Sequence, residues 1–382
     1  MQTVALGWLV LSLTGSGVAV GVNLALQFLP ILIFGLWGGL VADRFDKRRT
    51  LMRTQAAFAL LAGALWALTL SGVAELWMIY GLSLLIGTVT VIDNPTRQSF
   101  VTEMVGADLV ANAVSLNSAV FNASRIIGPA VAGVIIATVG LPWAFFINAV
   151  SFAAVIAGLR AMDPARLLRP EPAICEGGQV RAGLRYVWGV PRLRYTVLLV
   201  AIVATFGINF SVVLPLFARF EFHEGAGAFG FLTSMMALGA LVGALVSAAR
   251  KRPTRRLLIG SAAVFGGLSS AAAFAPTLPV LAMLLVPIGA ASITFIATAN
   301  ATLQLNSSPA MRGRVMALHG LVFLGSTPLG GPAIGWISET FGPRTGLATG
   351  GVICLLAALA AIAAIKRDAI GQRLRMVVAG GA

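Results

Sequence analysis

The sequence predicts an all-α membrane protein built from two bundles of six helices. Hydrophobic residues make up 58% of the chain and charged residues only 10%, whereas roughly a quarter of an ordinary soluble domain is charged. The apolar residues stand in blocks of about 20, the length that crosses a bilayer as a helix. The basic residues stand in short loops between these blocks, so the net charge of +14 favours a membrane surface over nucleic acid as the partner.

Twelve apolar blocks predict the spans, in the order Met1–Leu13, Val18–Val41, Thr50–Leu70, Leu76–Ile92, Val110–Val139, Leu141–Arg160, Tyr195–Phe217, Ala226–Ala249, Leu257–Ala275, Leu278–Leu305, Val315–Ile337 and Gly346–Ile365. The first is short, because 13 helical residues rise about 20 Å and the hydrocarbon core is about 30 Å thick. It has neither the charged start nor the cleavage site of a signal peptide. We expect a first helix that lacks its cytoplasmic half, with a genuine half-helix as the alternative.

The loops predict the orientation of the chain. Of the 27 Lys and Arg residues, 24 stand in the even-numbered loops, at their edges or in the carboxyl-terminal tail, whereas Arg219 and Arg344 stand on the other side and Arg125 stands within a span. Because cytoplasmic loops of membrane proteins are enriched in Lys and Arg, the even-numbered loops and the carboxyl terminus are expected in the cytoplasm.

The longest polar stretch predicts the division into domains. Residues 1–160 form an amino-terminal bundle, 161–194 a cytoplasmic linker, 195–366 a carboxyl-terminal bundle and 367–382 a cytoplasmic tail. Three prolines mark the first part of the linker as irregular. Its second part places Val180, Leu184, Val187 and Trp188 on one helical face with arginines around it, which is typical of a helix lying on an anionic membrane surface. Docking of a partner protein is the alternative.

Two short motifs recur in the second half of the chain. Asn94-Pro95-Thr96-Arg97-Gln98 in the fourth span region returns as Asn300-Ala301-Thr302-Leu303-Gln304 in the tenth, and Gly128-Pro129-Ala130 in the fifth returns as Gly331-Pro332-Ala333 in the eleventh. Equivalent positions in the two sets of six spans indicate a duplicated unit, as expected of a transporter built from repeats.

The loop after the second span carries a family resemblance. Gly39, Asp43, Arg44, Arg48 and Arg49 match the signature Gly-x-x-x-Asp-(Arg/Lys)-x-Gly-x-(Arg/Lys)-(Arg/Lys). The segment resembles the corresponding loop of major facilitator superfamily (MFS) transporters, but it has Asp46 where the family usually has glycine. Gly243 and Arg250-Lys251-Arg252 resemble the second copy of the signature, with Ser247 in place of the acid.

A second resemblance lies in the fifth span. Gly128-Pro129-x-x-Ala132-Gly133 is similar to the core of the helix-five signature of MFS drug:proton antiporters, where Gly128, Pro129 and Gly133 would serve helix packing. Together with Asn94–Gln98 and Arg312-Gly313-Arg314-Val315, it resembles the MFS branch of enterobactin exporters and macrolide efflux proteins. The resemblance implies the MFS fold, export across a bacterial inner membrane and coupling to protons.

The resemblance also implies a conformational latch at the cytoplasmic ends of the helices. In this interpretation the Asp43 carboxylate faces the positive amino end of the eleventh span, and Asp93 pairs with Arg44 or Arg97. The expected latch residues are Gly39, Asp43, Arg44, Arg48, Asp93 and Arg97. For Lys47, Arg48 and Arg49 the simpler interpretation, that they only set topology, is favoured.

Arg125 lies halfway along the fifth span, where a charge usually faces a cavity or a partner. Ser115, Ser118 and Asn122 share its helical face, so this stripe is expected to line a substrate cavity. A structural cation bound by carbonyls of neighbouring helices is the alternative. The expected cavity residues are Ser118, Asn122, Arg125, Asn209, Thr298 and Asn300.

Neither Asp nor Glu stands at the middle of a span, so proton coupling has no obvious carrier. Asp93 and His319 are candidates, and a carrier in the missing part of the first helix is the alternative. No phosphate-binding loop, metal-ligand cluster or nucleophile–base pair is evident, so the sequence predicts neither an enzyme nor a bound cofactor or metal.

The predicted function is therefore secondary transport by alternating access, as a monomer in the lipid bilayer. The expected activity is proton-coupled export of a siderophore, a macrolide-like drug or a related metabolite. Import or facilitated exchange of a small polar metabolite is one alternative. A non-transporting membrane protein, such as a scramblase or an assembly factor, is the other.

Overall fold

A computed structural model describes residues 1–105, 109–168, 179–250 and 253–380 of the chain. For some helical residues within these ranges, among them Gly39, Asp43, Ser115 and residues 365–380, only the backbone is described. The described residues form α-helices, a few π-helical and 3-10 turns, and short connections without strands.

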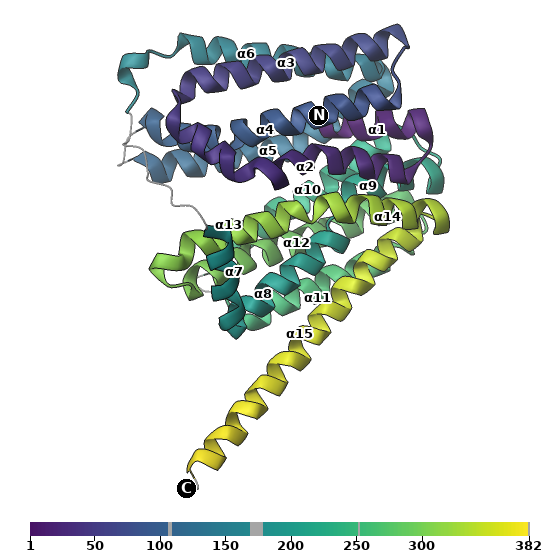
Figure 1. Ribbon diagram of the computed structural model, residues 1–382. Coiled ribbons are helices and arrows are strands. Elements are labelled where there is room, and N and C mark those ends of the chain that lie inside the picture. The colour runs from purple at the N-terminus through teal and green to yellow at the C-terminus, as the bar shows by residue number, and fades with distance from the viewer. Residues whose placement is uncertain (106–108, 169–178, 251–252, 381–382) are drawn as a thin grey trace.

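The first half of the chain forms the layer at the top of Figure 1. Its helices are α1 (Gln2–Thr14), α2 (Gly17–Arg44), α3 (Lys47–Ser71), α4 (Leu76–Val105), α5 (Val110–Thr138) and α6 (Leu141–Ala161). We call these six helices the amino-terminal half. Helix α1 begins beside Gly128, which lies near the middle of α5.

The second half of the chain forms the lower layer of Figure 1. It contains α7 (Gln179–Gly189), α8 (Pro191–Ile202), η3 (Val203–Gly207), α9 (Phe210–Leu216), η4 (Phe217–Glu221), α10 (Ala226–Ala248), α11 (Arg255–Ala272), α12 (Leu278–Asn306), α13 (Pro309–Gly325), α14 (Thr327–Phe341) and α15 (Pro343–Gly380). We call the helices from α8 to α15 the carboxyl-terminal half.

These helices make an all-α membrane protein. In the described ranges, ten helical segments are long and apolar enough to cross a bilayer, while α1 is a shorter apolar helix. Large apolar side chains point outward, including Leu60, Trp77 and Phe274, which are 75%, 66% and 77% exposed. An exterior with many large exposed apolar side chains suits lipid rather than water as the surrounding medium.

Three predicted spans differ from the helices in extent or regularity, although the seventh and the eleventh lie within the span candidates Pro191–Glu221 and Met311–Phe341. Helix α4 continues past the predicted end at Ile92, through Pro95 to Val105, because Asp93 is paired with neighbouring side chains. The seventh span is interrupted by the π-helical turn η3 and the non-helical residues Ile208 and Asn209. The eleventh span is divided into α13 and α14 at Ser326, just before Pro328.

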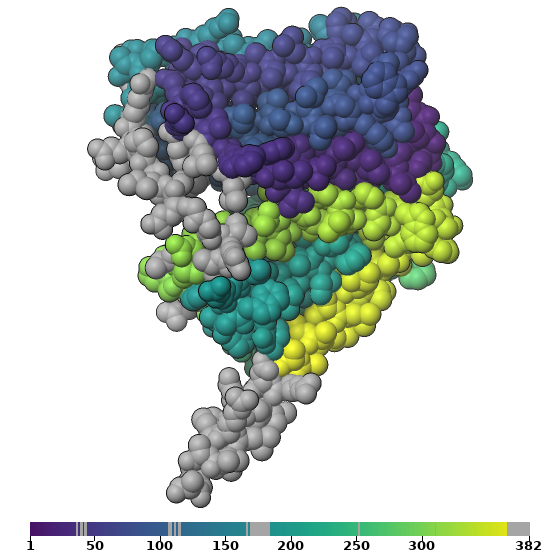
Figure 2. All heavy atoms as spheres, in the orientation of Figure 1, coloured from purple at the N-terminus to yellow at the C-terminus, as the bar shows by residue number. Residues whose placement is uncertain are grey.

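The two halves meet where glycines let helix backbones touch. A Cβ atom added to Gly17 of α2 would lie 2.8 Å from the carbonyl oxygen of Gly335 in α14, and Gly21 lies even closer to Gly331. In the same way, Gly230 of α10 approaches the backbone of Pro129 and Gly133 in α5. Figure 2 shows α2 lying directly against α14 without a visible gap. We call these two contacts the glycine seam.

The loops that are rich in Lys and Arg, such as the loop between α2 and α3, lie at one end of the helices, and we call this the basic end. Here the amino terminus of α3 is fixed to its neighbours. Lys47 Nζ lies 2.6 Å from Glu103 Oε1 of α4, and their side chains are only 10% and 7% exposed. Arg48 donates to the carbonyl oxygens of Leu159 at 2.6 Å and Arg160 at 3.0 Å, where its charge complements the carboxyl end of α6. Lys47 and Arg48 therefore do more than set topology.

The linker is attached to both halves. Leu168 N–H donates to the Glu103 carbonyl at 2.9 Å, and Leu167 packs against Leu51, Phe100 and Leu159 of the amino-terminal half. On α7, Val187 is fully buried against residues of α8, α12 and α13. The predicted amphipathic helix is therefore present, but its apolar face is shared: Val187 packs on protein, whereas Leu184 and Trp188 are exposed.

We predict that Gly21→Leu lowers the midpoint of thermal unfolding by several degrees, because the added side chain cannot fit against Gly331. Overpacking of this kind costs about 1–3 kcal/mol. Gly81→Leu is the matched control, since nothing lies within 4 Å of a Cβ atom at Gly81. Equal midpoints for the two variants, measured on purified protein in detergent, would contradict a closely packed seam.

We also predict that Lys47→Met destabilises the protein by about 3–5 kcal/mol, because it leaves the Glu103 carboxylate buried and unpaired. The double variant Lys47→Met/Glu103→Met should regain most of this loss, since no charge then remains buried. Unfolding midpoints measure both effects, with the exposed Arg53→Met of the same helix as control. A double variant less stable than either single variant would refute the pairing.

Candidate functional site

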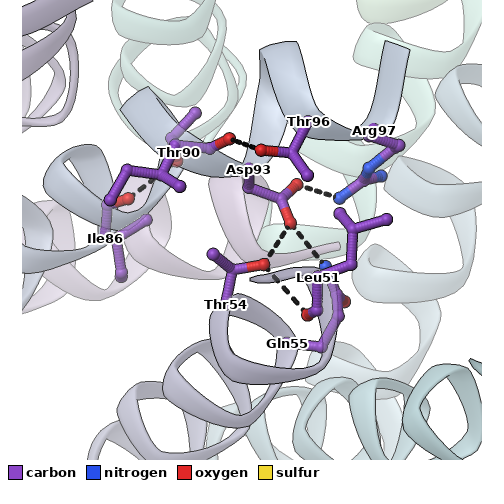
Figure 3. Close-up of polar contacts among 9 residues, drawn as sticks. Leu51, Thr54, Gln55, Ile86, Thr90, Asp93, Thr96 and Arg97 are labelled. Carbon is purple, nitrogen blue, oxygen red and sulfur yellow. Dashed lines mark hydrogen bonds and ion pairs between the residues drawn. The ribbon is translucent and has the colours of Figure 1, made fainter. Parts of the chain in front are cut away.

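The most connected polar group at the basic end is the carboxylate of Asp93 on α4. Figure 3 shows it between two helices. From α3, Thr54 Oγ1 donates to Asp93 Oδ1 at 2.7 Å and Gln55 Nε2 donates at 2.8 Å. On α4 itself, Arg97, one turn further along, forms an ion pair with Oδ2. Asp93 is only 2% exposed, so these three donors replace the water that a carboxylate requires.

The structure identifies which arginine pairs with Asp93. Of the two arginines proposed for Asp93, its partner is Arg97, while Arg44 is exposed at the end of α2. The Arg97 side chain is 55% exposed, so Arg97 is accessible to solvent while Asp93 is shielded from it. Thr54 and Gln55 were missed by the sequence analysis, although two adjacent polar residues inside the apolar block Thr50–Leu70 were a usable signal.

Other members of the expected latch are placed differently. Arg48 binds the carboxyl end of α6, so its contacts lie within the amino-terminal half and do not bridge the two halves. The surroundings of Gly39 and the side chain of Asp43 lie outside what the structure describes, and the contact of this segment with the eleventh span stays a prediction. Helix α13, the first part of that span, contacts α2, and Gly325 at the carboxyl end of α13 lies against Leu32.

The polar stripe of α5 continues the glycine seam toward the basic end. Ser118, Asn122, Arg125, Pro129 and Gly133 follow one another at intervals of three or four residues, so they share a helical face. Pro129 and Gly133 are covered by α10, and Ser234 Oγ donates to the Ile126 carbonyl at 2.9 Å. Toward the basic end the same face is open: Ser118 and Arg125 are exposed and Asn122 is half-buried. The halves therefore touch along one part of this face and separate along the rest.

The helix-five motif and its second copy both lie at the seam. Pro129 and Gly133 of α5 approach Gly230 of α10, and Gly331 of α14 approaches Gly21 of α2. Pro129 and Pro332 lack N–H groups, and both are accommodated inside their helices. The recurring Gly-Pro-Ala sequence thus occupies equivalent positions at the contact between the halves.

The expected cavity residues of the carboxyl-terminal half are mostly interior. Asn209 and Thr298 are 2% and 4% exposed, and Asn209 lines a small pocket together with Phe206, Phe210 and Ser269. Thr298 Oγ1 donates to the Thr294 carbonyl of its own helix, and Asn209 Nδ2 donates to the carbonyl of Thr205. Both residues are thus largely enclosed by helix packing, and their role in a substrate cavity stays a prediction.

Two remaining candidates have different surroundings. Asn300 is half-buried and accepts a bond from Gln304 Nε2 at 2.6 Å. His319 is 7% exposed, stacks near Phe323 and has no hydrogen-bond partner at Nδ1. In the described ranges, no cluster of three His, Cys, Asp or Glu side chains is placed to hold a metal ion.

Solved transporters share this arrangement of helices. The structure superposes on that of the nucleoside transporter NupG with a TM-score of 0.74, covering 95% of this chain and 94% of NupG at 14% identity. A bacterial homologue of the human lysosomal transporter Spinster, in an inward-facing and unoccupied conformation, gives a TM-score of 0.70 at 14% identity, covering 94% of this chain and 91% of that one. These likenesses show the fold.

Curated relatives are bacterial transporters. The multidrug efflux pump Tap of Mycobacterium tuberculosis is 28% identical over 351 residues, which are 86% of this chain and 81% of Tap. The staphyloferrin A transporter of Staphylococcus aureus is 28% identical over 252 residues, 64% of this chain and 61% of that protein. The enterobactin exporter EntS of Escherichia coli is 24% identical over 260 residues, 67% of this chain and 62% of EntS.

A family model described as a transmembrane secretion effector matches residues 1–372, nearly the whole chain. The match agrees with the helix arrangement, the loop signature at Gly39–Arg49 and the relatives, all of which are transport proteins rather than enzymes. This chain belongs to the transmembrane secretion effector family of the major facilitator superfamily of membrane transporters.

Proposed function

We propose that this transporter is a proton-coupled exporter of a siderophore, a macrolide-like drug or a related metabolite. The observation that carries the proposal is the α5 face, which is sealed by α10 along Pro129–Gly133 and open at Ser118, Asn122 and Arg125. A surface closed at one end and open at the other is what alternating access requires. The relatives named as an enterobactin exporter and multidrug efflux pumps support export as the direction.

The basic end is proposed to face the cytoplasm of a bacterium, across the inner membrane. Loops at this end hold most of the Lys and Arg residues, in keeping with the positive-inside tendency. The open part of the α5 face then receives cargo from the cytoplasm, and the carboxyl terminus is cytoplasmic. Movement of the bundles 1–160 and 195–366 within one monomer would carry the site to the other side.

Arg125 is the charged residue proposed to contact cargo. Its guanidinium lies 6.0 Å from the centre of the Phe121 ring, one turn earlier on the same helix. An exposed cation beside an aromatic ring suits a partly hydrophobic molecule with anionic or polar oxygens. Siderophores and many natural-product drugs have this chemistry, which is why they are the proposed cargo class.

Asp93 is the proposed proton carrier, in preference to His319. Its carboxylate joins α3 and α4 and pairs with the exposed Arg97, so protonation would release Arg97 and weaken the contact between the two helices. His319 is enclosed and has no charged partner among the described contacts, so its protonation has no evident route to helix movement.

Export predicts a measurable change in drug accumulation. Cells that lack their own efflux pumps and express this protein should retain less of a fluorescent macrolide than cells with the empty vector, and a protonophore should remove the difference. A panel of dyes, macrolides and catecholate siderophores extends the search. Unchanged accumulation of every compound, with the protein shown in the membrane, would refute the export proposal.

Asp93→Asn should leave the protein folded and reduce proton-driven export by at least tenfold, since the amide keeps the bonds from α3 but cannot titrate. The measurement is export into vesicles with and without an imposed pH gradient. Thr54→Val is the control, because it removes one bond to Asp93 and keeps the carboxylate. Export that still responds fully to the pH gradient in Asp93→Asn would exclude Asp93 as the carrier.

A further inference from the structure

At the end of the molecule opposite the basic end, α1 and α2 form a tight hairpin. Helix α1 ends at Thr14, and Gly15 adopts the left-handed conformation with φ of 66°. Ser16 then caps α2, accepting a bond from Ala19 N–H at 3.1 Å. The hairpin therefore presents the carbonyl end of one helix and the amide end of the next, which carry partial negative and positive charge respectively.

Each of these helix ends is bound by a charged residue from the other half of the chain. Arg219 of η4 donates from Nη1 to the Leu11 carbonyl of α1 at 2.6 Å. Glu339 of α14 accepts at Oε2 from Ser16 Oγ at 2.5 Å and from Val18 N–H at 3.0 Å. In both contacts the sign of the side chain is opposite to that of the helix end it binds.

The contacts of Glu339 depend on α2 and α14 lying against each other. Gly17, which lies between Ser16 and Val18, belongs to the glycine seam with Gly335. Glu339 stands one helical turn beyond Gly335 on α14, so it reaches the α2 terminus only while the two backbones touch. Separation of α2 from α14 would break both bonds to Glu339 and expose the amide end of α2 to solvent.

Arg344, a second arginine at this end of the molecule, makes a different kind of contact from Arg219. Arg344 Nε lies 2.7 Å from Glu221 Oε2, and its Nη1 donates to the Ala273 carbonyl at 3.1 Å. All three residues belong to the carboxyl-terminal half. Among the described residues, the contacts of Arg344 therefore lie within that half, which makes it a matched control for Arg219.

We propose that Arg219 and Glu339 form a two-point latch that closes this end of the transporter by holding the two poles of the α1–α2 hairpin. The latch deepens the proposed alternating-access function by naming residues that position the halves. Glu339 is exposed and Arg219 half-buried, so each contact is weak enough to break during a transport cycle.

The test measures conformation alone, so it needs no knowledge of cargo. Spin labels at the exposed positions Val73 and Phe274, in loops of the two halves at this end, report their separation by pulsed electron paramagnetic resonance. The full-length protein is studied in lipid nanodiscs, with Cys175 and Cys354 replaced by serine and alanine. A second label pair at the basic end, Arg53 with Arg312, reports whether the opposite end closes.

Glu339→Gln and Arg219→Gln should each raise the ratio of long to short distances between Val73 and Phe274 by about threefold to fivefold, the effect of losing one charge at a helix end. The double variant should raise it further, and the Arg53–Arg312 distance should shorten in parallel. Arg344→Gln and Glu75→Gln, whose native contacts lie within one half, should leave the ratio unchanged.

Two results would overturn the latch. One is an unchanged ratio in all three latch variants. The other is an equal change in the Arg344→Gln control, which would indicate general loosening of this end. Both label pairs broadening together would show unfolding. Ser16→Ala, which keeps both charged residues and removes the hydroxyl that donates to Glu339 and accepts from Ala19 N–H, then decides by the same ratio. Absence of any drug export would refute the proposed function but would leave this measurement intact.

Discussion

The contact between the two halves depends on the absence of side chains at a few glycines. At Gly17 and Gly21 of α2, and at Gly230 of α10, the facing backbone leaves no room for a Cβ atom. Apolar side chains gain little by leaving lipid for protein, so helices in a membrane associate through close packing and polar contacts. The glycine seam provides that packing, and the open face of α5 begins where it stops.

Contacts within each half and contacts between the halves differ in kind. The Lys47–Glu103 pair and the Asp93 network are enclosed inside the amino-terminal half, and breaking either leaves a charge in a dry environment. Across the seam, by contrast, Glu339 is exposed to solvent and binds a helix end. Strong contacts within each half and weak contacts between the halves allow the two halves to move against each other without deforming.

Much of this fold could be predicted from the sequence because each span is one long apolar block. The bounds of α2, α5, α6 and α10 agree with prediction within three residues. The α4 prediction was wrong because Asp93 and Pro95 interrupt the apolar block, and hydropathy cannot show that Asp93 finds three donors. The break at Asn209 was missed because its neighbours are as apolar as those of a regular helix.

The candidate site was less predictable, because partners depend on which helices become neighbours. The α5 stripe could be seen from helical periodicity alone, whereas Thr54 and Gln55 gained meaning only when α3 was placed beside α4. Asn209 and Thr298 were both expected at a cavity because they are polar, yet Thr298 donates to a carbonyl of its own helix and is enclosed, whereas Asn209 lines a small pocket. Polarity alone does not show whether a residue lines a cavity or is enclosed by neighbouring helices.

The hairpin contacts of Arg219 and Glu339 have a consequence for how such a protein can vary. An ordinary ion pair can be inverted, because exchanging both residues restores the attraction. A helix end cannot be inverted, since its polarity is fixed by the direction of the chain and the handedness of L-amino acids. Of the two signs of charge, only a cation is attracted to the carbonyl end of α1 and only an anion to the amide end of α2. Each position can lose its charge, but no second substitution can repair a reversed one.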